Sequence, residues 1–103
     1  MTSKITTPPL VLVFAASDPT AGAGIQADLL TLASLGCHAL SALTAITVQD
    51  TVGVESVHPV AAEIVERQAR TLLEDMRVAA FKVGVLGSVE NVVVVAEIVS
   101  DYP

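Results

Sequence analysis

The sequence predicts an α/β protein with a mainly parallel sheet and flanking helices. Apolar segments typical of buried strands alternate along the chain with segments that have helical periodicity. The first apolar segment, residues 10–16, is continuously apolar, as expected for a strand covered on both faces. A glycine-containing bend follows it and opens a helix, and ligands bind at such junctions in parallel α/β folds. The expected order is β-α-β-(β)-α-β-α, with right-handed crossovers.

The first half of the chain supplies two strands and one helix. Residues 1–9 are polar and contain two prolines, so we expect a loose lead-in to the strand at 10–16. A helix is expected over residues 23–35, with Gly36 as its C-terminal stop. Its apolar face carries Ile25, Leu29, Leu32 and Ala33 at helical spacing. Residues 38–48 are rich in alanine, threonine and β-branched side chains and form the second strand.

A short extended segment and a second helix follow. The extended segment covers residues 54–57, and Pro59 stands at or just before the helix at 60–75, where its missing N–H does no harm. The apolar face of that helix is expected to bury Val60, Ile64, Ala69, Leu72 and Leu73. Its polar face carries Glu63, Glu66, Arg67 and Arg70.

The last two elements are a strand at 78–85 and a helix at 89–100. Ser88 is a suitable N-cap for that helix, although the valine run 92–95 by itself equally suits a strand. A sheet of three or four strands leaves a long apolar edge without a partner, and such edges favour association. We therefore expect either a piece of a larger α/β domain or an obligate oligomer.

Composition excludes several classes of protein. Five Lys and Arg against eleven Asp and Glu give a net charge of −6, which argues against nucleic-acid or anionic-membrane surfaces. No apolar run approaches the roughly 18–20 residues of a membrane-spanning helix. A single cysteine, Cys37, suits a reducing cytoplasm. Cys37 and His38 are adjacent and would point to opposite faces of a strand, so we expect no metal site there.

The bend after the first strand matches G-x-G-x-x-A over residues 22–27, a relaxed dinucleotide fingerprint. Asp18 precedes the bend, and Asp28 lies about one turn into the helix, where carboxylates compete with a pyrophosphate. No Lys or Arg occurs between Lys4 and Arg67 to neutralise one. The bend therefore favours a neutral, hydrogen-bonding small molecule. The alternative is that both carboxylates only cap and solvate the helix.

Three segments carry a more specific signal. They are residues 18–28 (DPTAGAGIQAD), 43–51 (LTAITVQDT) and 82–86 (KVGVL). Their order and spacing resemble hydroxymethylpyrimidine/phosphomethylpyrimidine kinase, a thiamine-biosynthesis enzyme with a ribokinase-like fold. That family has the patterns D-P-S-G-G-A-G-I-Q-A-D, T-A-x-x-x-Q-N-T and K-x-G-M-L.

The chain departs from these patterns at Thr20, Ala21, Asp50 and Val85. Ala21 replaces the first glycine and adds a Cβ in a turn where a positive φ is expected. Val85 replaces Met and shortens a pocket wall.

The resemblance implies a pyrimidine pocket made of Ala23, Gly24, Asp28, Thr47, Gln49 and Val85. The Gln49 amide would pair with a ring nitrogen and the amino group, since it both donates and accepts. Thr47 would offer backbone groups, Ala23 and Gly24 would bring main chain over the ring, and Val85 would pack against it. Asp28 would accept a hydrogen bond from the hydroxymethyl group.

Two residues keep alternatives that rest on the sequence alone. Without the resemblance, Gln49 belongs to a polar turn that closes the second strand. Lys82, within an apolar strand, is either a structural lysine that reaches the surface by its stem or a charge partner for Asp28 or Asp50.

The resemblance also implies that residues 1–103 are the amino-terminal part of one ribokinase-like kinase domain. The implied reaction is ATP-dependent phosphorylation of hydroxymethylpyrimidine and its monophosphate, with ATP and Mg²⁺ as cofactors. The family's ATP site and glycine-rich anion hole lie farther along the sequence, and no match to them occurs before Pro103. We therefore assign no catalytic residue here and expect the isolated chain to be inactive.

The expected partners are a small pyrimidine and further copies of the chain, in the cytoplasm, with neither nucleic acid nor membrane. Two other functions remain open. One is a dinucleotide-binding α/β domain, which rests on the G-x-G-x-x-A match. The other is a non-catalytic module for small-molecule binding or oligomerisation, which rests on the short length and open sheet edges.

Overall fold

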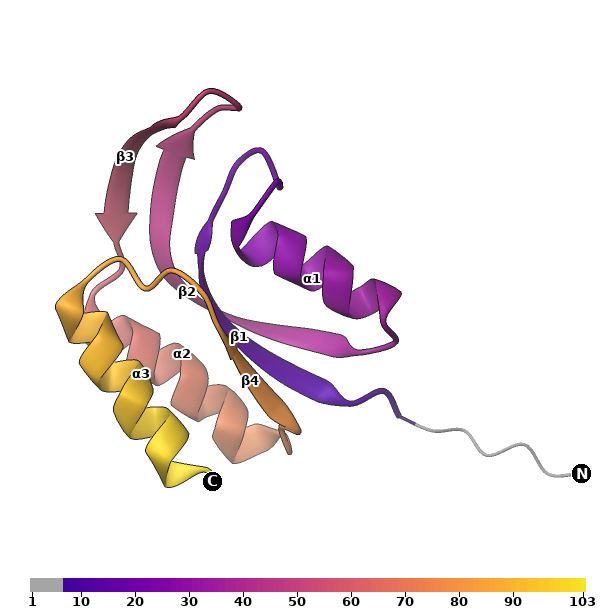
Figure 1. The fold of residues 1–103 in the computed structure, drawn as a ribbon. Helices are drawn as coiled ribbons and strands as arrows, with labels where there is room; N and C mark the ends of the chain where they lie inside the picture. Colours follow the sequence, from indigo (N-terminus) through magenta and orange to yellow (C-terminus); the bar gives the residue numbers. More distant parts are fainter. Residues whose placement is uncertain (1–6) are drawn as a thin grey trace, which may run out of the picture.

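The computed structural model describes residues 7–103 and contains a four-stranded sheet with three helices (Figure 1). Most of the predicted lead-in at 1–9 lies outside the described residues. The elements are β1 (Leu10–Ser17), α1 (Gly24–Ser34), β2 (His38–Gln49), β3 (Val54–Pro59), α2 (Ala62–Asp75), β4 (Ala80–Val83) and α3 (Val89–Asp101).

The sheet has the strand order β3-β2-β1-β4. Strand β1 lies between β2 and β4 and is parallel to both, whereas β3 is antiparallel to β2. The predicted α/β class, element order and mainly parallel sheet are confirmed. Because β1, β2 and β4 run in the same direction, their carboxyl ends meet at one edge of the sheet, beside the β2–β3 hairpin (Figure 1).

Helices cover both faces of the sheet (Figure 1). Side chains of β1 alternate between the two faces, so Leu12 and Phe14 pack with α2 and α3, while Val13 and Ala15 pack with α1. Residues 11–16 of this strand are all buried. The strand predicted to be covered on both faces is therefore the centre of the core.

Helix α1 ends where the sequence predicts. Gly36 has a φ of +80°, a conformation that costs little without a Cβ. The Gly36 N–H donates to the Ala33 carbonyl, and the Cys37 N–H donates to the Leu32 carbonyl at 2.9 Å. This is the hydrogen-bond pattern of a Schellman motif. However, Ala33, which was expected on the buried face, is exposed.

Helix α2 begins two residues later than predicted, because Pro59 is the last residue of β3. The prediction that Ile64 is buried is wrong, since 40% of it is exposed. Val65 and Ala69 are the residues buried against the sheet. The other four predicted residues do contact the core, since Ala69 is buried and Val60, Leu72 and Leu73 pack against it.

The predicted strand at 78–85 is shorter in the structure, where β4 spans only Ala80–Val83. Beyond β4, the Gly84 N–H donates to the Phe14 carbonyl at 2.7 Å. The Thr44 hydroxyl donates to the Val85 carbonyl at 2.7 Å. Residue 85 therefore bonds to β2, and strand pairing with β1 does not continue to it.

The valine run 92–95 is helical within α3. The Ser88 hydroxyl accepts a hydrogen bond from the Asn91 N–H at 3.1 Å, as expected for an N-cap. Val95 is buried, whereas Val92 and Val93 are each half exposed. Capping and helical spacing therefore override the β-propensity of this run. Among residues 7–103, no helix is both long and apolar enough to cross a membrane.

Candidate functional site

A cavity of about 360 Å³ opens at the carboxyl ends of the parallel strands. Most of its wall is made of alanine, glycine and valine residues, with a few polar groups among them. It is lined by Ala15, Ala16, Ser17, Asp18, Ala23, Gly24, Thr47, Gln49, Val54, Val57, Lys82, Gly84 and Val85. A small apolar cavity with a few polar groups is the usual form of a small-molecule site.

The cavity brings together most of the residues singled out by the sequence. Ala23, Gly24, Thr47, Gln49 and Val85 all line it. The sixth residue, Asp28, is not part of the lining. It bonds to Lys82, and Lys82 lines the cavity. The two chain reversals near Ala23 and near Gln49 therefore meet at one cavity at the same edge of the sheet.

Asp18 organises the bend between β1 and α1. Its carboxylate accepts hydrogen bonds from the Thr20 N–H, the Thr20 hydroxyl and the Ala23 N–H, each at 2.9 Å. Its own N–H donates to the Gln26 side-chain oxygen at 2.8 Å. Only 5% of Asp18 is exposed. The Thr20 N–H has the largest effect on the pKa of this carboxyl and lowers it, partly offset by burial.

The carboxylate of Asp18 therefore takes backbone N–H groups that a bound phosphate would need at this bend. It therefore holds the shape of the bend and is not a free ligand group, and the N–H groups that it takes lie before the first turn of α1.

Two residues of the bend have a left-handed backbone. Gly24 has a φ of +67°, and a Cβ there would lie 2.6 Å from the Ala16 carbonyl oxygen. Gly24 thus allows the first turn of α1 to approach the end of β1 closely. Ala21 has a φ of +59° and is the one non-glycine residue with positive φ in the described part of the chain. The expected positive φ at this departure from the family pattern is confirmed.

Thr47 and Gln49 lie on the same face of β2, two residues apart. The Thr47 hydroxyl is 2.7 Å from the Ser17 carbonyl oxygen and 2.8 Å from Gln49 Oε1. A hydroxyl has one hydrogen to donate, so it serves only one of these oxygens at a time. When Ser17 accepts that hydrogen, the Gln49 amide is free to bond to a ligand.

An ion pair lies beside the cavity. Lys82 Nζ is 2.9 Å from Asp28 Oδ2, although the two residues are 54 positions apart in the sequence. The Lys82 side chain is 46% exposed and that of Asp28 is 17% exposed. Of the two carboxylates considered as partners of Lys82, the structure therefore pairs it with Asp28.

Val85 is 65% exposed, so this wall of the cavity is open. The Thr44 hydroxyl fixes its backbone through the 2.7 Å bond to the Val85 carbonyl. Cys37 is half-buried and packs beside α1, and His38 is exposed. Within residues 7–103, no group of three or more His, Cys, Asp or Glu side chains is placed to hold a metal ion.

Sequence reasoning did not identify Val54 and Val57 as cavity residues. The β2–β3 hairpin folds these two side chains toward the cavity, and Val57 lies opposite Thr47 in the antiparallel register. The only signal in the sequence was a short extended segment after Gln49. The sequence of this segment does not show that it pairs with β2.

Sequence reasoning also missed Asn91. This residue is fully buried, and its Nδ2 contacts the carbonyl oxygens of Thr44, Val60 and Leu86 at 2.9–3.1 Å. It ties β2 to the segments that precede α2 and α3. Its position in the first turn of a capped helix gave no indication of this role.

Known proteins resemble this chain in sequence. Residues 18–103 match the sequence profile of phosphomethylpyrimidine kinase. The hydroxymethylpyrimidine/phosphomethylpyrimidine kinase of Streptomyces coelicolor is 48% identical over 94 residues, which are 91% of this chain and 35% of that protein. The chain spans about a third of the length of the first curated relatives that it matches.

Solved structures of vitamin kinases have the same fold as this chain. A phosphomethylpyrimidine kinase from Clostridium difficile 630 superposes with a TM-score of 0.86 at 37% identity, over 91% of this chain and 41% of the other. The pyridoxal kinase of Bacillus subtilis, solved as an ADP complex, gives 0.84 at 30% identity, over 91% of this chain and 37% of the other. The fold is thus ribokinase-like, and by its sequence the chain belongs to the phosphomethylpyrimidine kinase family.

Proposed function

We propose that this chain is the substrate-binding, amino-terminal part of one ribokinase-like kinase domain. The domain would phosphorylate hydroxymethylpyrimidine and its monophosphate with ATP. The observation that carries the proposal is the single cavity shared by Ala23, Gly24, Thr47, Gln49 and Val85. Three separate segments of the family pattern supply these residues.

The wall of the cavity suits a flat, uncharged heterocycle. Small residues at Ala23 and Gly24 let main chain approach one face of a ring, and Val57 and Val85 offer apolar contacts. The Gln49 amide would pair with adjacent donor and acceptor atoms of an aminopyrimidine. A hydroxymethyl group directed toward α1 would reach Asp28, whose carboxylate can accept its hydrogen.

ATP and Mg²⁺ do not fit the residues described here. Lys82 is the one cationic residue on the cavity wall within residues 7–103, and it is already bonded to Asp28. Phosphoryl transfer from ATP needs several positioned charges and a metal. We therefore propose that other parts of the kinase domain hold ATP and Mg²⁺.

The alternative of a dinucleotide-binding domain is disfavoured by Asp18. Its carboxylate takes the Thr20 and Ala23 N–H groups, and it would repel a pyrophosphate at the same bend. A more serious competitor is pyridoxal phosphorylation, because pyridoxal kinases share this fold with comparable TM-scores. The first experiment must therefore offer both heterocycles.

That experiment uses a chimaera in which these residues replace the matching third of the Streptomyces coelicolor kinase. We expect ATP consumption with hydroxymethylpyrimidine and much less with pyridoxal, with the unmodified kinase as reference. A folded chimaera that prefers pyridoxal, or uses neither compound, would contradict the proposal. The 103-residue chain alone should not consume ATP.

Replacement of Gln49 by Ala tests the site itself. Because the polar atoms of the ligand would lose their partner, binding of the pyrimidine should weaken by about 1–3 kcal/mol. Replacement of the neighbouring exposed residue Thr51 by Ala is the matched control and should leave the affinity unchanged. Isothermal titration of both chimaeras measures this, and equal affinities would remove Gln49 from the site.

We also propose a location and an assembly for the protein. A single half-buried cysteine and an acidic composition suit the cytoplasm. The open sheet edges suit a homo-oligomer.

A further inference from the structure

The Lys82–Asp28 ion pair lies beside the cavity, and binding of the pyrimidine ring does not use the Lys82 ammonium group. Lys82 lies on β4 opposite Val13, so its side chain is on the α1 side of the sheet. A Cβ on Gly84 would lie only 3.3 Å from Lys82 Nζ. The glycine therefore leaves the space through which the lysine reaches along the strand to the cavity.

The charges at this end of the cavity are arranged asymmetrically. Asp28 is mostly buried and directs its carboxylate to the ammonium group, whereas nearly half of the Lys82 side chain is exposed. An ammonium group has three hydrogens, and Asp28 uses one of them. Lys82 therefore keeps donors that can bond to a second anion without moving far.

We propose that Lys82 determines specificity for the phosphorylated substrate by binding its phosphate. This inference rests on the proposed function. The alcohol would bond to Asp28 and leave the ion pair intact. The monophosphate brings about two negative charges to the same place, where Asp28 repels them and Lys82 attracts them. Binding of the alcohol thus depends on Asp28, and binding of the monophosphate depends on Lys82.

A purely structural ion pair predicts a different behaviour. Exposed pairs contribute little to stability, commonly about 0–1 kcal/mol, so loss of Lys82 would then affect both ligands equally or neither. The structural interpretation and the specificity interpretation are therefore separated by the ratio of the two affinities rather than by stability.

The experiment titrates the full 103-residue chain with hydroxymethylpyrimidine and with its monophosphate, followed by ¹⁵N NMR. Lys82→Met keeps the apolar stem and removes the charge. We expect at least a tenfold weaker affinity for the monophosphate and less than a threefold change for the alcohol. Lys82→Arg should restore most of the monophosphate affinity. Asp28→Asn should act in the opposite sense and tighten monophosphate binding.

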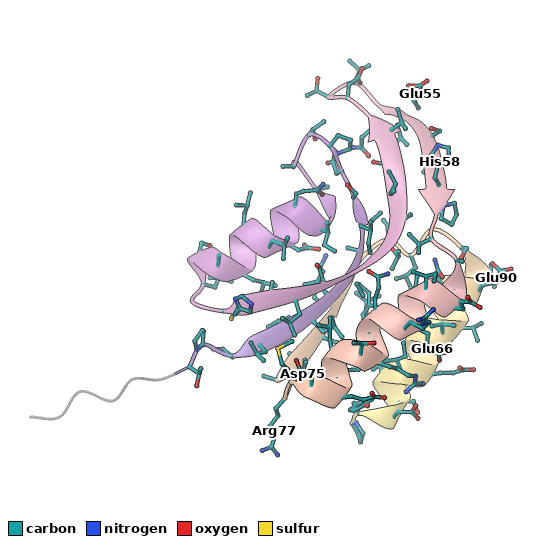
Figure 2. The ribbon with its side chains drawn as sticks, turned by 180° about the vertical axis from the view of Figure 1, so that it is seen from behind. Glu55, His58, Glu66, Asp75, Arg77 and Glu90 are labelled. Carbon is teal, nitrogen blue, oxygen red and sulfur yellow. The ribbon has the colours of Figure 1, made fainter. Side chains whose placement is uncertain are left out.

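Arg77→Met is the matched control, since Arg77 is an exposed cation at the end of the molecule away from the β2–β3 hairpin (Figure 2). It should change neither affinity. If Lys82→Met weakens both ligands equally, or neither, the specificity role is wrong while the proposed function stands. If the unsubstituted chain binds neither pyrimidine, the same titrations are made with the chimaera, and a folded chimaera that binds neither contradicts the proposed function as well. Amide spectra of each variant establish that it is folded.

Discussion

Ala21 holds a conformation that its side chain disfavours. Its φ of +59° brings Cβ close to the following backbone, which costs roughly 1–2 kcal/mol for an L-residue. Ala21→Gly should therefore stabilise the fold by about 0.5–1 kcal/mol, after allowing for the greater freedom of glycine in the unfolded chain. Urea unfolding measures the change.

Ala23→Gly is the matched control for this substitution. Ala23 has a φ of −149°, which any residue adopts, so glycine brings only added freedom and should destabilise the fold. If both substitutions destabilise the chain equally, the left-handed conformation at Ala21 is not strained.

Asp18 makes the stability of the bend dependent on pH. Its folded-state pKa is lowered below the ordinary value of 3.8, first of all by the Thr20 N–H. Its contribution is therefore fully present above about pH 4–5 and is lost as the pH falls through the lowered folded-state value. We expect urea midpoints of the chain to fall between pH 5 and about pH 2, and Asp18→Asn to flatten that dependence.

Asp50 provides the comparison for Asp18. Its pKa is also lowered, chiefly by the Val52 N–H, but it lies in the exposed β2–β3 turn away from the core. Asp50→Asn should change the pH dependence less than Asp18→Asn does. The reverse order would show that the turn, rather than the bend, limits acid stability.

At the scale of the elements, Asn91 is the polar link between them. Its amide nitrogen lies within hydrogen-bonding distance of carbonyls of β2, of the segment before α2 and of the segment before α3. Its Oδ1 has no partner among residues 7–103. Asn91→Leu should cost about 1–3 kcal/mol, because these carbonyls lose a donor.

Asn91→Asp should lower the stability of the fold further, by about 3–5 kcal/mol near neutral pH, because it places a buried charge against carbonyl oxygens. Thermal unfolding of both variants at pH 7 and at pH 5 tests this. The Asp variant should recover part of its loss at the lower pH, as its carboxyl takes up a proton. An Asp variant as stable as the Leu variant would contradict the arrangement.

On the scale of the whole molecule, apolar surface remains uncovered. Leu30, Leu35, Val85 and Val89 are each more than 60% exposed. Strand β4 forms one edge of the sheet, and a hollow of about 760 Å³ lies between its start and the end of α3, with Phe81 and Tyr102 on its wall. Both features favour association.

We therefore expect the 103-residue chain to self-associate as its concentration rises, measured by sedimentation velocity. Val83→Lys, on β4, should reduce association because a lysine at a sheet edge disfavours strand pairing. Val52→Lys, at the tip of the hairpin, is the control and should have less effect. Equal effects of the two lysines would place the contact elsewhere than at β4.

The sequence by itself determined which segments are strands and helices and which residues make the bends. The continuous apolar run at 10–16, Gly36 and Ser88 act through backbone conformation and nearest neighbours, and such local preferences can be read from the chain. The order of the family segments likewise indicated that the bends near Ala23 and Gln49 share a site. On α2 the prediction was wrong only at Ile64, because two adjacent apolar residues compete for one position facing the sheet and the structure buries Val65.

Only the tertiary structure decided which distant groups meet. It placed β4 beside β1, folded Val54 and Val57 toward the cavity, paired Lys82 with Asp28 and directed Asn91 to three carbonyls. These contacts join residues far apart in the chain, and no periodicity or turn signal encodes them. They follow from how the two faces of the sheet are packed, because packing fixes the positions from which side chains can reach one another.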